Sequence, residues 1–115
     1  MHATPQPHGD PLDRAFAALA DPTRRGILER LWSADASIGE LAERFAMTRT
    51  GVAKHVRLLE EAGLVATRKA GRVRTVTVGP HRLEDVARWI EAYRASVEER
   101  LERLDAFLHR IQGEG

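Results

Sequence analysis

The sequence contains no cysteine, almost no net charge and no long apolar run. The absence of cysteine excludes disulfides and thiolate metal sites, and it is compatible with a reducing cytosol. No segment approaches the roughly 20 apolar residues of a membrane span, and no stretch near the N-terminus resembles a secretory signal. We therefore expect a cytoplasmic protein that makes no contact with membranes. The 115 residues, 43% of them hydrophobic, are enough for one domain with a small core.

The net charge of +1 conceals an uneven distribution of charged residues. Residues 48–82 contain eight Lys/Arg and two Asp/Glu, a balance of +6. The flanking segments are acidic, with balances of −2 over residues 1–47 and −3 over residues 83–115. Charge runs are usually solvated surface, but a basic segment between two acidic ones also suits a polyanionic partner.

The basic segment coincides with a helix-turn-helix pattern. Ser37 is suited to start a short helix over residues 38–45, and Thr48 a second helix that runs to about Glu61. Both side chains accept a hydrogen bond from a backbone N–H that lacks a helical partner. Ala46 and Met47 form the connection between the helices. Two short helices on a brief turn, with the second rich in basic residues, predict a DNA-binding unit.

Two strands are expected next, over residues 64–68 and 72–78, with a turn at residues 69–71 and Pro80 ending the hairpin. A basic hairpin at this place is typical of a wing. Upstream, apolar spacing predicts helices over residues 12–19 and 22–32. The predicted fold is mainly α with a small β-hairpin wing, a winged helix-turn-helix in the order α-α-α-α-β-β-α. Residues 1–11 are expected to be a flexible arm, residues 12–82 the DNA-binding domain and residues 83–115 a dimerisation helix.

The last predicted helix has apolar residues at steps of three and four from Leu83 to Ile111, with one stutter between Val97 and Leu101. At about 1.5 Å per residue, this heptad seam is roughly 40 Å long. Its first half is expected to fold onto its own domain, but a small winged-helix body cannot cover all of it. A two-fold homodimer is the natural solution. The expected dimer contacts are Leu12, Phe16, Leu19, Trp89, Ile90, Tyr93, Val97, Leu101, Leu104 and Leu108.

The outward face of the second helix in the motif is predicted to read DNA. Arg49 and Lys54 suit guanine O6 and N7, whereas Arg57, one turn later, is expected to contact phosphate. His55 borders the buried stripe, so reading DNA and packing inside the protein are both open for it. Gly51 suggests a close approach to the first helix of the motif. The predicted DNA contacts, wing included, are Thr48, Arg49, Thr50, Ala53, Lys54, His55, Arg57, Arg68, Lys69, Arg72 and Arg74.

Three stretches resemble the ArsR/SmtB family of bacterial winged-helix repressors: residues 20–28 (ADPTRRGIL), residues 48–65 around the recognition helix, and residues 71–74 at the wing. The resemblance covers roughly residues 12–110 and implies a homodimeric regulator that blocks transcription at a palindromic operator. Family members that sense metals use cysteine pairs or paired Asp/His ligands. Here the first helix of the motif has neither Cys nor His, and the last helix has only His109. The chain resembles instead the metal-independent branch, through Trp89-Ile90 with Tyr93 and Arg100-Leu101 with Leu104.

Other functions are weighed against this interpretation. No Ser-His-Asp grouping, phosphate-binding loop or metal cluster is present, so we expect no enzyme and no cofactor. A metal-responsive repressor with an unrecognised site and a winged-helix protein–protein module remain alternatives. A small-molecule pocket near Trp89 and Tyr93 is a further one, although aromatics at helical spacing are more often core. The sequence identifies neither an effector nor the operator.

Overall fold

The computed structural model describes residues 10–114, and the side chains of all of these except 80–82 and 114. The elements follow in the order α1 (Pro11–Leu19), α2 (Pro22–Ser33), β1 (Ala36–Ser37), α3 (Ile38–Arg44), α4 (Arg49–Glu61), β2 (Val65–Ala70), β3 (Val73–Val78) and α5 (Pro80–Glu114). The predicted winged helix-turn-helix fold is confirmed, with β1 as an additional short strand. Most of the flexible arm expected over residues 1–11 lies outside the described residues.

Side-chain caps determine where four of the helices begin. The Asp10 carboxylate accepts from the Leu12 N–H at 2.8 Å, and the Asp21 carboxylate from the Arg24 N–H at 3.0 Å. Ser37 and Glu40 cap α3 reciprocally, since the Ser37 hydroxyl accepts from the Glu40 N–H and the Glu40 carboxylate from the Ser37 N–H. That second bond holds the pKa of Glu40 below its usual value. Thr48 caps α4, since its hydroxyl accepts from the Gly51 N–H. The caps at Ser37 and Thr48 place α3 and α4 within a residue of their predicted starts.

The two helices of the motif end in the same way. After α3, the Met47 N–H donates to the Ala42 carbonyl and the Ala46 N–H to the Glu43 carbonyl. After α4, the Leu64 and Gly63 N–H groups make the equivalent pair of bonds to the Leu59 and Glu60 carbonyls. Both are Schellman motifs, which require a left-handed residue just past the helix. Gly63 fills that position after α4 with φ 76°, and Ala46 fills it after α3 with φ 53°.

The sheet has three antiparallel strands in the order β1-β3-β2. The two-residue strand β1 was not predicted, because two residues are too short to show alternation. The hairpin turn was also predicted one or two residues too early. Lys69 and Ala70 belong to β2, opposite Arg74 and Val73, so only residues 71–72 form the turn. Gly71 adopts φ 62°, as the first position of a type II′ hairpin turn requires.

The core lies where α1, α2, α3, α4 and the sheet meet. Its fully buried large side chains are Ile27, Leu41, Val52, Val56, Leu59, Leu64 and Val76. The stripe predicted for α4 is thus confirmed as its inward face. Among the α5 residues whose side chains are described, Val86 alone joins the buried cluster, with Leu83 packed partly against it. The body therefore encloses the start of α5 and no more.

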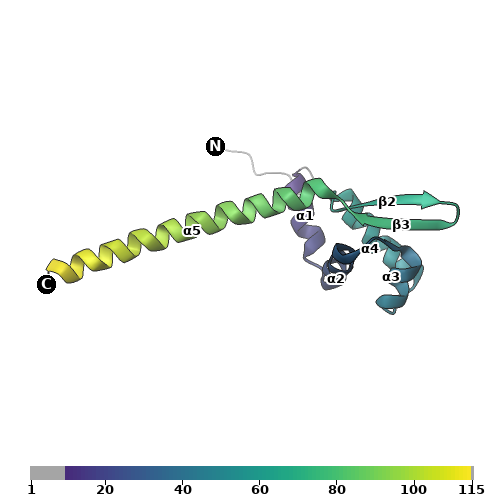
Figure 1. Ribbon diagram of the computed structural model, residues 1–115, viewed down its shortest axis with the longest axis horizontal. Coiled ribbons are helices and arrows are strands. Elements are labelled where there is room, and N and C mark those ends of the chain that lie inside the picture. Colours follow the sequence, from purple (N-terminus) through teal and green to yellow (C-terminus); the bar gives the residue numbers. More distant parts are fainter. Residues whose placement is uncertain (1–9, 115) are drawn as a thin grey trace.

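The long helix α5 leaves the body and projects into solvent (Figure 1). Its 35 residues span about 52 Å, and the whole molecule measures 74 × 37 × 21 Å. We expected the first half of the seam to fold back onto its own domain, and this was wrong beyond Trp89. Leu83 and Val86 pack against the core and Trp89 meets Phe16 of α1, but Ile90, Tyr93 and Val97 are exposed. From Ile90 to Ile111 the apolar seam is exposed. In the part of the chain that the structure describes, no helix combines the length and apolarity needed to cross a membrane.

Candidate nucleic-acid interface

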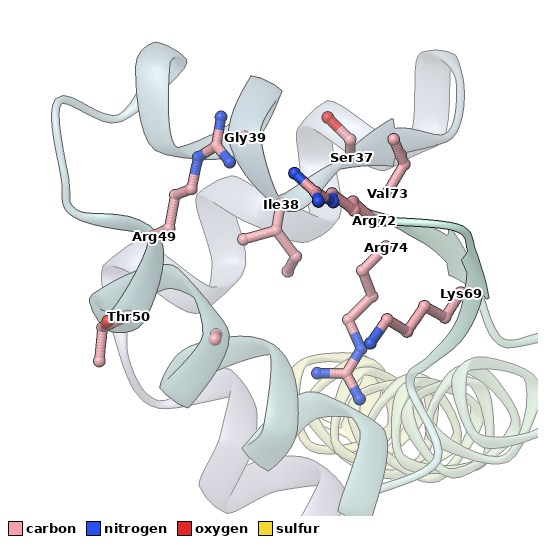
Figure 2. Close-up of a pocket in the computed structure, with 10 residues that line it drawn as sticks. Ser37, Ile38, Gly39, Arg49, Thr50, Lys69, Arg72, Val73 and Arg74 are labelled. Atoms are coloured by element: carbon pink, nitrogen blue, oxygen red, sulfur yellow. The ribbon is translucent and has the colours of Figure 1, made fainter.

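A groove of about 530 Å³ separates the helix-turn-helix from the wing. The start of α3 forms one wall, the first turns of α4 a second, and the hairpin a third (Figure 2). Among the described residues, the ten that line it include four cations and no carboxylate. The lining residues are Ser37, Ile38, Gly39, Arg49, Thr50, Ala53, Lys69, Arg72, Val73 and Arg74.

Two of these cations lie directly opposite each other on the hairpin. Lys69 pairs with Arg74 across β2 and β3, and in Figure 2 both side chains extend from the hairpin toward α4. Like charges in directly opposed positions destabilise a β-ladder. An anion between the wing and α4 relieves this repulsion, so the pair is suited to a phosphate.

Arg49 contributes the cation on the opposite wall. Its guanidinium lies over Gly39, where a built Cβ would meet the Arg49 Nη2 atom at 3.0 Å and Cζ at 3.3 Å. The side chain therefore reaches from the first turn of α4 back across the start of α3, as Figure 2 shows. This direction suits a contact at the edge of the groove as well as one with a base.

The exposed face of α4 carries the remaining predicted readers. Lys54 and Arg57 are exposed beside the buried stripe and lie outside the groove lining. Thr48 caps the helix, with its hydroxyl accepting from the Gly51 N–H at 3.0 Å. The reason proposed for Gly51 needs correction. The atoms that a Cβ there would approach belong to Thr48 and Met47 in the turn, at 3.2 and 3.3 Å, and not to α3.

Two predicted DNA contacts lie apart from the others. Arg68 is the neighbour of Lys69 on β2. Since successive side chains of a strand point to opposite faces, the Arg68 side chain extends from the other face of the hairpin. His55 faces α2, where its Nδ1 atom lies 3.4 Å from Arg24 Nη1 and 3.9 Å from Asp21 Oδ2. Of the two roles left open for His55, this position favours packing within the protein.

The residues expected at a dimer contact form two groups. Leu12 and Leu19 pack partly against the core. The others are exposed, and three of them stack: the Phe16 ring meets Trp89 edge-on at 5.5 Å, and Trp89 lies parallel to Tyr93 at 5.9 Å. Phe16 on α1 thus joins the apolar face of α5. The exposed members are Phe16, Trp89, Ile90, Tyr93, Val97, Leu101, Leu104 and Leu108.

Sequence reasoning missed the contribution of α3 to the groove. Ser37, Ile38 and Gly39 line it because the capped start of α3 lies beside the first turn of α4. The only available signal was Gly39, whose missing side chain leaves room for Arg49. Within residues 10–114, no three His, Cys, Asp or Glu residues gather in a way that could hold a metal ion.

Comparison with known proteins gives consistent matches. A family model described as a helix-turn-helix domain matches residues 19–68. The HTH-type transcriptional regulator Rv2034 of Mycobacterium tuberculosis is 44% identical over 68 residues, which are 59% of this chain and 64% of that protein. The transcriptional repressor SdpR of Bacillus subtilis is 28% identical over 69% of this chain and 88% of its own length.

A solved structure gives the longest of the matches described. The crystal structure of the ArsR family transcriptional regulator RHA00566 superposes with a TM-score of 0.71, at 36% sequence identity. The match covers 84% of this chain and 97% of that one. The likeness therefore extends beyond the helix-turn-helix to almost the whole of that regulator.

Proposed function

This chain belongs to the ArsR family of transcriptional regulators, and we propose that it binds a palindromic DNA operator as a homodimer and represses transcription there. The observation that carries the proposal is the groove between α4 and the wing, lined by four cations and no carboxylate among the described residues. A polyanion is the partner that such a groove fits best.

In the proposed complex, the exposed face of α4 enters the major groove. Lys54 and Arg49 at its N-terminal half reach base edges, where a bidentate contact with guanine discriminates by about 1–3 kcal/mol. Thr50 and Ala53 offer methyl groups to thymine. Arg57, Lys69, Arg72 and Arg74 contact the backbone and position the protein without selecting sequence.

The proposed dimer uses α5 together with Phe16 of α1. The exposed apolar face from Trp89 to Ile111 is continuous, and charged pairs such as Arg94–Glu98 and Arg103–Glu99 flank it along the helix. A second copy of the chain offers a complementary face of the same composition, as two-fold symmetry demands. Two recognition helices then meet half-sites about one helical turn apart on one side of the DNA.

Repression is proposed by similarity, because SdpR is named a repressor and an operator-bound dimer obstructs a promoter by occupying it. In this proposal the protein acts in the cytoplasm, together with the DNA that it binds. We assign no effector.

Selection of bound sites from random duplex DNA by the purified protein tests this function. The expected result is an inverted repeat whose half-sites are centred about 34 Å apart. Lys54→Ala is expected to relax base preference at one position per half-site, and the matched control Arg57→Ala to weaken binding on all sequences alike. Absence of duplex binding at low salt would contradict the proposal and favour a protein–protein module. Tight zinc binding that alters operator affinity would favour a metal-responsive repressor.

A further inference from the structure

One arginine, Arg24 of α2, joins two helices that have different tasks in the proposed complex. Its Nε donates to the Ala18 carbonyl at 2.8 Å and its Nη2 to the Ala17 carbonyl at 3.4 Å, both at the C-terminal end of α1. Its third nitrogen, Nη1, lies 3.4 Å from His55 Nδ1 on α4. The three nitrogens of one planar guanidinium thus serve partners on two different helices.

The helix α1 itself lies between the proposed dimer surface and the recognition helix. It contacts α5 on one side, where Phe16 packs edge-on against Trp89, and α4 on another. The last carbonyls of a helix lack donors from a following turn, so caps, side chains or water must satisfy them. At the end of α1 the Ala20 N–H donates to the Ala17 carbonyl at 3.2 Å. Arg24 satisfies the Ala18 carbonyl and adds a second, longer bond to Ala17 while it contacts α4.

The partner on α4 is held in place as well. His55 is half-buried on the side of α4 that faces away from the groove lining, and Asp21 Oδ2 lies 3.9 Å from its Nδ1 atom. Asp21 is fixed by its cap bond to the Arg24 N–H, which also holds the pKa of Asp21 below its usual value. The start of α2 therefore presents a fixed donor and a fixed carboxylate to one side chain of the recognition helix.

We propose that Arg24 and His55 are positioning residues, which fix the orientation of the recognition helix α4 relative to the dimer-forming helix α1. The inference rests on the proposed function, because it concerns how a dimer aligns two such helices with two half-sites. Neither residue touches DNA. Without the contact, α4 still meets DNA through its cations, but its base-reading side chains lose their alignment.

The chain provides a matched pair of variants for the test. Arg24→Lys keeps the charge, but lysine has one side-chain nitrogen in place of the three that contact α1 and α4. Arg25→Lys is the control. Within the described residues Arg25 makes one side-chain bond, from Nη1 to the Leu19 carbonyl at 2.7 Å, which one ammonium can replace. His55→Leu removes the acceptor on α4, and His55→Gln restores an acceptor oxygen at a similar reach.

Arg24→Lys and His55→Leu are each expected to lower the ratio of operator to non-specific affinity about tenfold, as couplings between neighbouring groups do. The slope of log affinity against log salt should stay the same, because no phosphate contact is lost. The double variant should have the same affinity ratio as either single variant. His55→Gln should keep most of the wild-type ratio, and Arg25→Lys should have the wild-type ratio. Equal losses in Arg24→Lys and Arg25→Lys, additive losses in the double variant, or a salt slope lower by about one unit would overturn the proposal.

Amide hydrogen exchange on the free protein separates this inference from the proposed function. Arg24→Lys should speed exchange in α4 around His55 severalfold and leave the distal half of α5 unchanged. If exchange in α4 is the same in Arg24→Lys and the wild type, the coupling is overturned, whatever the DNA-binding measurements show. If exchange in α4 is faster in Arg24→Lys but the wild-type protein selects no DNA site, the coupling is supported and the proposed function is rejected.

Discussion

The recognition helix α4 and the long helix α5 show the same apolar periodicity with opposite outcomes. In α4 the stripe Val52, Val56 and Leu59 is at most 2% exposed, because α1, α2, α3 and the sheet pack against this helix. In α5, Leu101 and Leu104 on the equivalent stripe are 59% and 53% exposed. An amphipathic pattern thus shows that a helix face requires cover, but it does not identify whether the same chain or another copy provides it.

The two regions should consequently differ in how they are stabilised. Burial within the body is intramolecular, so its contribution does not depend on protein concentration. Burial of the α5 seam is proposed to occur between two copies, so its contribution follows mass action. Substitutions in the two stripes should separate the two kinds of stabilisation.

The largest effect is expected from Leu59→Ala in the body. Leu59 is fully buried, and removal of its side chain leaves a cavity in a small core. The free energy of unfolding should fall by about 2–5 kcal/mol at every protein concentration. Chemical denaturation measured at two concentrations, tenfold apart, checks this. If the decrease in the free energy of unfolding is larger at the lower protein concentration, the core of the body depends on a second copy of the chain.

Leu104→Ala should have the next largest effect, and only on association. Each seam leucine contributes about 1–2 kcal/mol when covered, so loss from both copies should raise the dimer dissociation constant at least about 30-fold. Sedimentation measures that constant, and denaturation of the diluted protein should be unchanged. Glu102→Ala, an exposed substitution on the same helix, is the control. If both variants associate like the wild type, Leu104 is not in the dimer contact.

The same contrast explains how much was predictable from sequence. Caps at Ser37 and Thr48 are local chemistry, so they located α3 and α4 within a residue. The position of Gly71 in the turn depended on strand register, and the direction of α5 on packing with distant residues. Neither the position of the turn nor the direction of the helix can be predicted from a short stretch of neighbouring residues. The site followed the same rule: residues on α4 and at the wing were found by pattern, but the α3 wall of the groove and the Arg24–His55 contact were not.

The charges of the body and of α5 should also differ in their effect on DNA binding. Lys69 lies in the groove opposite Arg74, whereas Arg100 is on the exposed part of α5. Lys69→Ala should lower the salt slope by about one unit and weaken binding about fivefold at physiological salt on every sequence. Arg100→Ala should change neither value. Titrations over a range of salt concentrations measure both, and an unchanged slope for Lys69→Ala would count against a phosphate contact at the wing.

The smallest effect is expected at the turn between α3 and α4. Ala46 holds the left-handed position of a Schellman motif that glycine occupies at Gly63. A non-glycine residue there costs about 1–2 kcal/mol, and glycine loses about 0.4–1 kcal/mol through the entropy of the unfolded chain. Ala46→Gly should therefore stabilise the body by about 0.5–1 kcal/mol, and Gly63→Ala should destabilise it by a similar amount. Denaturation measures both, and neither variant should alter dimerisation. A destabilised Ala46→Gly would show that Ala46 makes packing contacts worth more than the strain it bears.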